Sequence, residues 1–307
     1  MGGDRPGVEG PSGVAIDFGG TKIAALRLRD GTILERGIAQ TDGAASAEQQ
    51  VEAIAELLGD LGLGAEEAVG VAVAGRVDSE GCWHALNTET LTQVARVPLR
   101  ALLSERLGRP VRVENDATAA AIGEHRYGAG RGTRNFGFVT VSTGVGGGLI
   151  VNGAPVVSAS GLAGHVGFMT STLSDRRCGS GRMLTVESRA GGRAIAHYAA
   201  AAGHPGLNAK DVYGAHLAGA PWASALIDTS AAAVAELCAN LKTVLDLDRI
   251  ALGGSIGLAE GYAGMVERHL AGEPEIFRVP VVRAELGHDP AFYGVLAPPN
   301  PSTSAAT

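Results

Sequence analysis

The sequence predicts an α/β protein of two lobes, each built around a mostly parallel sheet. Three observations lead to this prediction. The chain has 307 residues, which is enough for two domains of ordinary size. Apolar strands alternate with helical segments along most of its length. Two segments, from Val14 and from Phe136, repeat the same order of strand, Gly-rich turn, strand, tight turn and strand, which indicates a duplicated architecture.

The elements of the first lobe, residues 14–116, follow in order after a flexible tail at 1–13. Asp30-Gly31 between apolar runs is typical of a hairpin turn. Apolar spacing predicts a helix over 46–59, and a short apolar run predicts a strand over 69–74. A helix over 98–107 and a strand over 111–113 complete the lobe.

The second lobe, residues 117–288, begins with the rest of a helix over 116–125. Asn152-Gly153 marks the second hairpin turn. Helical spacing follows over 187–202 and 224–245, then a strand over 249–252 and a helix to about residue 270. We expect the helix over 289–297 to return to the first lobe, and 298–307 to form a second flexible tail.

Composition excludes several classes of protein. The net charge is −7 and 19% of residues are charged, so neither nucleic acid nor an anionic membrane is an expected partner. The three cysteines (Cys82, Cys178 and Cys238) are few and widely spaced, which excludes a disulfide scaffold and indicates a reducing compartment. No apolar run is long enough for a membrane span and no secretory signal is visible, so we expect a cytoplasmic protein.

The first candidate site is the turn Asp17-Phe18-Gly19-Gly20-Thr21-Lys22. Gly19 and Gly20 would let backbone N–H groups approach phosphate oxygens, and Thr21 and Lys22 add donors. Asp17, at the end of a strand, could hold Mg²⁺. The spacing is not that of a P-loop. An ordinary Gly-rich hairpin is the alternative.

The second candidate is Ser142-Thr143-Gly144-Val145-Gly146-Gly147-Gly148, which lies in the same strand–turn–strand context. It is not a dinucleotide fingerprint, because no helix follows it. Two such loops facing each other could clamp the phosphates of a nucleotide, and Gly253-Gly254-Ser255 offers a flat turn for adenosine. A simple strand-to-helix turn is the alternative at Gly253.

Asp116 follows an apolar strand and begins a helix in Glu114-Asn115-Asp116. A carboxylate there is favoured by the helix dipole, so capping is one interpretation. The other is a general base that takes the proton from a hydroxyl attacking a γ-phosphoryl group, with Asn115 holding the alcohol.

In combination, these motifs with Gly164-His165-Val166-Gly167 and the Cys178–Glu187 stretch resemble the ROK family of sugar kinases over about residues 14–297. The resemblance implies the two-lobed actin-like or hexokinase-type ATPase fold, an α/β fold with duplicated βββαβα units. Within the family, the segments from Ser160 and from Gly253 are most similar to bacterial N-acetylmannosamine kinases. A homodimer is the assembly that the resemblance implies.

The resemblance also implies residue roles. Asp116 would be the catalytic base, and Mg²⁺ would lie near Asp17. ATP would contact Asp17, Gly19, Gly20, Thr21, Lys22, Thr143, Gly144, Gly146, Gly147, Gly148, Gly253 and Gly254. The sugar would contact Gly75, Arg76, Asn87, Asn115, His165 and Glu187. From the residues alone, Asn87 could instead cap a turn, Arg76 could be a surface charge, and His165 could be a core histidine.

Two positions depart from the family's pattern. Leu162 stands where many members have a glutamate, so a glucokinase-like grip on a sugar hydroxyl is weakened. The family's zinc site needs one histidine and three cysteines, but Ser180 and Thr185 occupy two of the cysteine positions. His165 and Cys178 alone do not make a structural zinc site, so we expect none.

We therefore expect an enzyme that uses ATP and Mg²⁺ to phosphorylate a free sugar at its 6-hydroxyl, with N-acetyl-D-mannosamine as the leading substrate. A kinase of glucose, another hexose or a cyclitol stays open. A sugar-responsive repressor is not expected, because too few residues precede Asp17 for a DNA-binding domain. A non-catalytic sugar-binding regulator is the third alternative, against which Asp116 argues.

Overall fold

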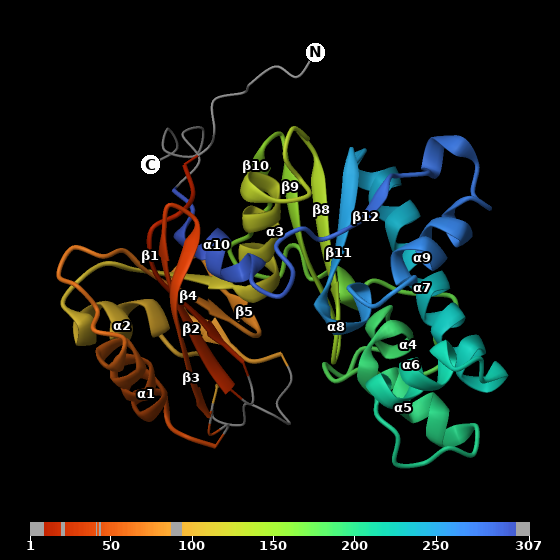
Figure 1. Cartoon of the computed structure of the whole chain (residues 1–307), viewed down its shortest axis with the longest axis horizontal. Coiled ribbons are helices and arrows are strands. Elements are labelled where there is room, and N and C mark those ends of the chain that lie inside the picture. The colour runs from red at the N-terminus through yellow and green to blue at the C-terminus, as the bar shows by residue number, and fades with distance from the viewer. Residues whose placement is uncertain (1–8, 20–21, 41, 43, 87–93, 299–307) are drawn as a thin grey trace. The chain divides into compact units, whose positions relative to one another are not determined.

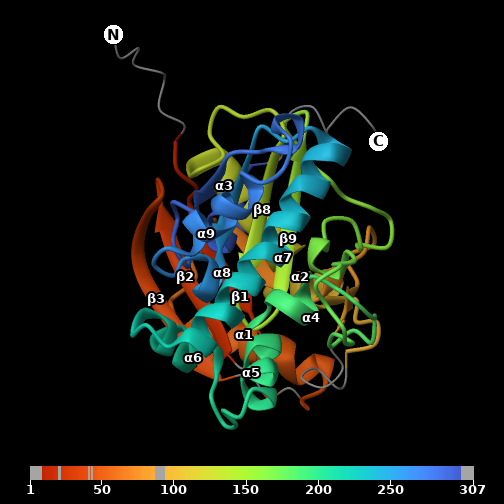
Figure 2. The ribbon, with the colours of Figure 1, turned by 90° about the vertical axis from the view of Figure 1, so that its right-hand side faces the viewer.

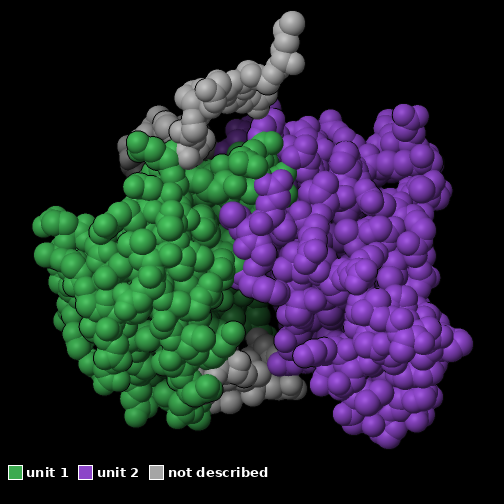
Figure 3. Space-filling model, in the orientation of Figure 1, with its two compact units in different colours: residues 1–131, 159–161, 289–307 green, residues 132–158, 162–288 purple. Residues whose placement is uncertain are grey.

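The computed structural model describes residues 9–19, 22–40, 42, 44–86 and 94–298, and the chain forms two compact units (Figure 3). Unit 1 comprises Met1–Arg131, Ala159–Gly161 and Asp289–Thr307, and unit 2 comprises Gly132–Ser158 and Leu162–His288. The boundary expected at residue 116 thus lies inside unit 1. The reason is that the helix beginning at Asp116 packs against other elements of unit 1.

Unit 1 contains a five-stranded sheet with the strand order β3-β2-β1-β4-β7 (Figure 1). β1 and β2 pair antiparallel, as do β2 and β3, whereas β1, β4 and β7 run parallel. The bounds are β1 (Gly13–Phe18), β2 (Lys22–Arg29), β3 (Thr32–Gln40), β4 (Val69–Val73) and β7 (Val111–Asn115).

Four helices cover the two faces of this sheet: α1 (Ala47–Asp60), α2 (Leu99–Leu107), α3 (Asp116–Tyr127) and α10 (Pro290–Leu296). On one face, alternate large residues of β1 (Val14, Ile16 and Phe18) join the core beneath α1 and α2. On the other face, β1 and β4 carry the small residues Ala15, Gly70 and Ala72, and α3 and α10 lie close to the sheet and to each other. A Cβ added at Gly294 would lie 1.7 Å from the Ala119 carbonyl oxygen, so this contact requires glycine.

A two-stranded hairpin of β5 (Arg76–Val77) and β6 (Trp83–His84) completes unit 1 and is absent from the sequence-based expectations. Trp83 anchors it, because its side chain is 1% exposed and its ring meets the Phe18 ring edge-on at 5.2 Å. The indole N–H donates to the Ala74 carbonyl at 2.8 Å. The hairpin is therefore fixed to the end of β4 by the core.

Unit 2 repeats the arrangement with the strand order β10-β9-β8-β11-β12. The bounds are β8 (Phe136–Val141), β9 (Val145–Val151), β10 (Ala154–Pro155), β11 (Arg249–Gly253) and β12 (Val281–Arg283). In both sheets a three-stranded meander is followed by two parallel strands on the side of its first strand. The predicted duplicated α/β fold is confirmed. The sheets are mixed and not mostly parallel, because the two tight turns of each meander make its strands antiparallel.

The helices of unit 2 are α4 (Glu187–Ala190), α5 (Gly192–Ala201), α6 (Ala209–Leu217), α7 (Pro221–Leu245), α8 (Gly254–Gly257) and α9 (Tyr262–Leu270), with single turns η1 (Val166–Phe168) and η2 (Glu275–Phe277). α7 crosses in front of the sheet in Figure 2, and both α7 and α9 contribute residues to one apolar core with the sheet. The helix expected over 187–202 is broken, because Gly191 is extended at φ −67° and ψ 155°. Within the described part of the chain, no helix has the length and apolar character that a bilayer crossing requires.

Candidate active site

Two carboxylates lie at the carboxyl ends of parallel strands in unit 1, where open α/β sheets usually bind ligands. Asp17 is the next-to-last residue of β1, and Asp116 follows β7 as the first residue of α3. Burial, and next the negative charge of Asp116, raises the pKa of Asp17 to about 7. Burial likewise raises the pKa of Asp116 to about 6. Both side chains are thus partly buried bases whose negative charge is poorly compensated.

Asn115 orients Asp116. Its side-chain oxygen accepts from the Thr118 N–H at 2.9 Å and so caps α3. Its amide nitrogen donates to the Gly75 carbonyl at 2.6 Å and to Asp116 Oδ1 at 2.9 Å. The Ala117 N–H donates to the same Oδ1 at 2.7 Å. Both donors and the acceptor of the Asn115 amide are therefore used within the protein, which makes it a positioning residue for Asp116.

The turn that follows β1 is closed by the Gly19 N–H, which donates to the Lys22 carbonyl at 3.0 Å. The Lys22 side chain is exposed, and its charge acts to lower the pKa of Asp17. Gly20, Thr21 and Asn87 lie outside the described residues.

The second Gly-rich loop is held from behind by α5 of unit 2. The carbonyls of Ser142 and Thr143 accept from the Gly192 N–H at 2.7 Å and from the Arg193 N–H at 3.1 Å. Because these carbonyls are turned toward α5, the loop does not present them to an anion. Thr143 is exposed, and Gly144 and Gly146 are partly exposed.

Gly147 and Gly148 differ from the other glycines of this loop because they are buried in β9. A Cβ at Gly147 would lie 2.5 Å from the Val166 side chain. The accessible part of the loop is therefore its first half, and Gly147 makes room for the Val166 side chain.

Gly253 and Gly254 have roles within the fold. Gly253 is buried, and a Cβ there would lie 2.5 Å from the Phe138 ring. Gly254 has φ 79°, which favours glycine, and opens α8. The hydroxyl of Ser255 lies 3.1 Å from that of Ser142, so this turn and the second Gly-rich loop are neighbours.

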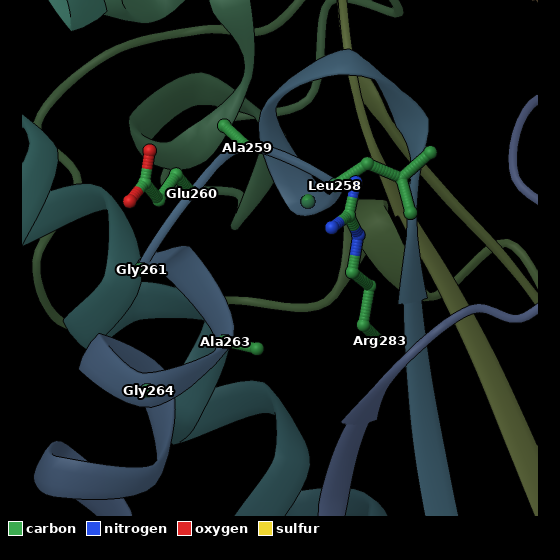
Figure 4. A pocket seen from close by; sticks show the side chains of 8 residues that line it. Leu258, Ala259, Glu260, Gly261, Ala263, Gly264 and Arg283 are labelled. Carbon is green, nitrogen blue, oxygen red and sulfur yellow. The ribbon is translucent and has the colours of Figure 1, made fainter.

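A pocket of about 390 Å³ begins one turn further along, at the end of α8 (Figure 4). Its lining is mostly small or apolar, with two charged side chains, Glu260 and Arg283, on opposite sides. The residues that line it are Gly257, Leu258, Ala259, Glu260, Gly261, Ala263, Gly264 and Arg283. Unit 2 thus places a Gly-rich loop, a Gly-Gly-Ser turn and a pocket in succession.

Glu187 begins α4 and points at the second Gly-rich loop. Its Oε2 accepts from the Val145 N–H at 3.1 Å, and a Cβ at Gly144 would lie 2.3 Å from the same oxygen. Burial raises its pKa, against the lowering effects of the Val145 N–H, Arg193 and Cys178. His165 precedes η1, with Nδ1 3.0 Å from the Leu162 carbonyl oxygen and its ring stacked on Phe168.

The residues around Cys178 do not fit the zinc site that the resemblance implies. The Cys178 sulfur lies 3.0 Å from the Ser180 hydroxyl, and no group of three or more possible metal ligands occurs among the described residues. Thr185 is buried and bonds Ser188, whose hydroxyl also lies 2.8 Å from that of Ser174. Hydroxyl hydrogen bonds thus hold the end of this loop, and the absence of zinc stays a prediction.

The carboxylate of Asp17 has surroundings that suit a magnesium ion. It is partly buried, and the charges of Asp116 and Asp289 both raise its pKa. A cation would relieve this accumulation of negative charge. Mg²⁺ is commonly held by one or two carboxylates together with the phosphates of a substrate.

Sequence reasoning missed the polar residues beside Arg76. Arg76 lies in β5, where its guanidinium bonds the Ser160 carbonyl and lies 3.1 Å from His84 Nδ1. His84 in turn contacts Asp78. The signal that could have found them is the alternation of Arg76, Asp78 and His84 with apolar residues around the turn at Gly81, but two-residue strands produce almost no periodic pattern.

Comparison with known proteins places this geometry in a family. The N-acetylmannosamine kinase of Haemophilus influenzae is 37% identical over 281 residues, which is 92% of this chain and 93% of that protein. That of Vibrio cholerae is 39% identical over 92% of this chain and 96% of its own. The bifunctional enzyme NanE/NanK of Brucella melitensis is 38% identical, and this chain spans about half of its length (52%).

Solved structures of ROK family proteins are also similar to this chain. A ROK hexokinase from Thermus thermophilus superposes with a TM-score of 0.76 at 31% identity, covering 92% of this chain and 96% of that one. A ROK family glucokinase from Streptomyces griseus, solved with glucose and AMPPNP, gives 0.77 at 29% identity over 94% and 98%. The match to the family extends over residues 13–297, and so through both duplicated sheets and both Gly-rich loops. This chain therefore belongs to the ROK family.

Proposed function

We propose that this protein is an ATP-dependent sugar kinase that transfers the γ-phosphoryl group to the 6-hydroxyl of N-acetyl-D-mannosamine. The observation that carries the proposal is Asp116, a partly buried carboxylate with its pKa raised to about 6 and its orientation set by Asn115. The N-acetylmannosamine kinases at 37% and 39% identity support the choice of sugar.

Asp116 would act as the general base. Its hydrogen bonds from Ala117 and Asn115 both end on Oδ1. Oδ2 would then receive the proton of the sugar hydroxyl as its oxygen bonds the γ-phosphorus and the bond to ADP breaks. A pKa near 6 leaves the carboxylate ionised at neutral pH while keeping it more basic than an exposed aspartate.

Unit 2 would hold the nucleotide. The N–H groups of Thr143 and Gly144 would face the phosphates, and Gly146, which is partly exposed near the start of β9, would leave room for them. The adenosine would enter the pocket that Leu258 and Arg283 line. Asp17 would hold Mg²⁺, which when bound neutralises phosphate charge. In unit 1, Lys22 is the candidate cationic contact for a phosphate.

Each unit offers its own candidate contacts for the sugar: Arg76 in unit 1, and His165 and Glu187 in unit 2. Leu162, which is 52% exposed, would offer the sugar an apolar surface at the position where the glutamate of many family members would hydrogen-bond a hydroxyl. A kinase of glucose is the second candidate, because the Streptomyces griseus relative was solved with glucose.

A coupled assay of ADP release over a panel of N-acetylmannosamine, glucose, other hexoses and cyclitols tests the proposal. We expect the highest kcat/KM for N-acetylmannosamine and a 6-phosphate product by phosphorus–proton correlation NMR. Leu162→Glu should shift the ratio of kcat/KM toward glucose. Turnover of no sugar by the wild type, or a clear preference for glucose, would refute the assignment.

We also propose a homodimer and a cytoplasmic location. Both proposals rest on the family resemblance and on the need for ATP and a free sugar. Light scattering on the purified protein and fractionation of its host cells test them directly.

A further inference from the structure

The β5–β6 hairpin of unit 1 places three polar side chains in a row. Arg76 and His84 are paired residues of the two strands. Nη2 of Arg76 lies 3.1 Å from Nδ1 of His84, and Nε2 of His84 lies 2.8 Å from Oδ2 of Asp78. His84 is 8% exposed, so its ring has little freedom to turn.

These contacts determine where the imidazole carries its proton. A guanidinium can only donate hydrogen bonds, so Nδ1 of His84 must accept and the hydrogen must lie on Nε2. That N–H donates to Asp78, whose other oxygen accepts from the backbone N–H groups of Glu80 at 3.0 Å and Cys82 at 2.9 Å. The hydrogen bond from His84 is the largest cause that lowers the pKa of Asp78 to about 2.

We propose that His84 and Asp78 are positioning residues that hold the Arg76 guanidinium ready for the sugar. The inference rests on the proposed function, in which Arg76 contacts the substrate. Asp78 selects the tautomer of His84, and that tautomer supplies the acceptor that orients Arg76. The Ser160 carbonyl accepts from the other terminal nitrogen of Arg76, so two fixed acceptors determine the plane of the guanidinium.

The surroundings make this row rigid. A Cβ at Gly75 would lie 2.5 Å from the His84 carbonyl oxygen, and Gly75 itself has φ 107°. Gly75 also accepts the hydrogen bond from Asn115. The backbone beside Arg76 is therefore tied to the residue that orients Asp116, and a fixed guanidinium would place the sugar relative to the catalytic carboxylate.

Two substitutions of His84 separate positioning from simple support of the hairpin. An asparagine amide oxygen lies near the place of Nδ1, so His84→Asn keeps an acceptor for Arg76 and loses the contact with Asp78. A glutamine amide nitrogen lies near the place of Nε2, so His84→Gln keeps the contact with Asp78 and loses the acceptor. We expect His84→Gln to raise KM for N-acetylmannosamine roughly 10-fold, with kcat and the affinity for AMPPNP little changed. His84→Asn should stay within about threefold of the wild type.

Asp78→Asn gives an independent readout. Its amide nitrogen would face Nε2 of His84 and favour the tautomer with the hydrogen on Nδ1, which points a donor at the donor of Arg76. We expect the same rise in KM as for His84→Gln. Nitrogen-15 NMR of the imidazole should show hydrogen on Nε2 in the wild type and on Nδ1 in the variant.

The outcomes separate the inference from the proposed function. If the wild type phosphorylates no sugar, the proposed function fails, whatever the tautomer of His84. If it phosphorylates N-acetylmannosamine but His84→Gln and Asp78→Asn match the wild type in KM, the positioning inference is overturned. Equal losses in His84→Asn and His84→Gln, with the same fall in melting temperature, would also overturn it, since hairpin support alone would explain them.

Discussion

Replacing Asp116 by asparagine should inactivate the protein and stabilise it at the same time. Asparagine keeps the shape of the side chain and can still accept from the Ala117 N–H, but it cannot take a proton from a hydroxyl. We expect kcat to fall by at least about 10²–10⁴-fold, the usual contribution of a general base.

The gain in stability follows from the pKa of Asp116. Its pKa is about 6 in the folded protein against an ordinary 3.8, so the folded state binds the proton more tightly than the unfolded state does. The free energy of unfolding therefore falls as the pH rises through this window. At about pH 7.5 the ionised carboxylate costs about 3 kcal/mol, and at about pH 4.5 only about 1 kcal/mol. An uncharged amide removes this cost.

Urea unfolding of the wild type and of Asp116→Asn, without nucleotide or Mg²⁺, measures the effect at both pH values. The variant should gain about 3 kcal/mol at pH 7.5 and about 1 kcal/mol at pH 4.5. Glu48→Gln serves as a matched control, since Glu48 is an exposed carboxylate of unit 1 whose pKa is lowered by hydrogen bonds. Equal stability of variant and wild type at pH 7.5, or retention of kcat, would refute the reasoning.

Three further predictions concern packing, the loop between Cys178 and Glu187, and the nucleotide. Gly294→Ala should destabilise the folded protein by about 1–3 kcal/mol or more in thermal melts, because the added Cβ would lie 1.7 Å from the Ala119 carbonyl oxygen. Gly264→Ala is the control: its Cβ would have no atom within 4 Å, and it should stabilise the protein by roughly 0.5–1 kcal/mol. Thr185→Val should lower the free energy of unfolding by about 1–3 kcal/mol, because it breaks the buried hydrogen bonds between Thr185 and Ser188. Elemental analysis of the purified protein should find no stoichiometric zinc. About one zinc per chain, lost together with activity on chelation, would contradict this. Gly146→Val should weaken binding of AMPPNP in calorimetry without affecting sugar binding, and unchanged affinity would remove this loop from the nucleotide site.

Most of the secondary structure could be predicted because its signals are local. The Asp30-Gly31 and Asn152-Gly153 turns both have positive φ at their two residues, as hairpins of this kind require. The helix that ends near Leu245 also lies where its spacing predicts. The prediction of one continuous helix over 187–202 was wrong. Gly191 is extended, and the Gly192 N–H donates to the Ser142 carbonyl, so the chain turns between α4 and α5.

The residues of the candidate site also differ in how far the sequence could predict them. Asp17 and Asp116 could be proposed from the sequence, because a polar residue at the end of an apolar strand is visible there. Glycines were ambiguous: Gly144 and Gly147 belong to one motif, but only the first is accessible. A glycine that lets the backbone approach a ligand and a glycine that makes room for a side chain cannot be distinguished in the sequence. Which of the two roles a glycine has depends on neighbours that are distant in the chain.

The sequence by itself thus determined the α/β duplication, the order of its elements and the two carboxylates, all of which follow from periodicity and turn chemistry within a few residues. Tertiary structure alone decided that Glu187 meets the Val145 N–H and that Asp78, His84 and Arg76 form one row. It also raised the pKa values of Asp17 and Asp116. These properties depend on burial and on hydrogen bonds between segments that only folding brings together, so no local pattern encodes them.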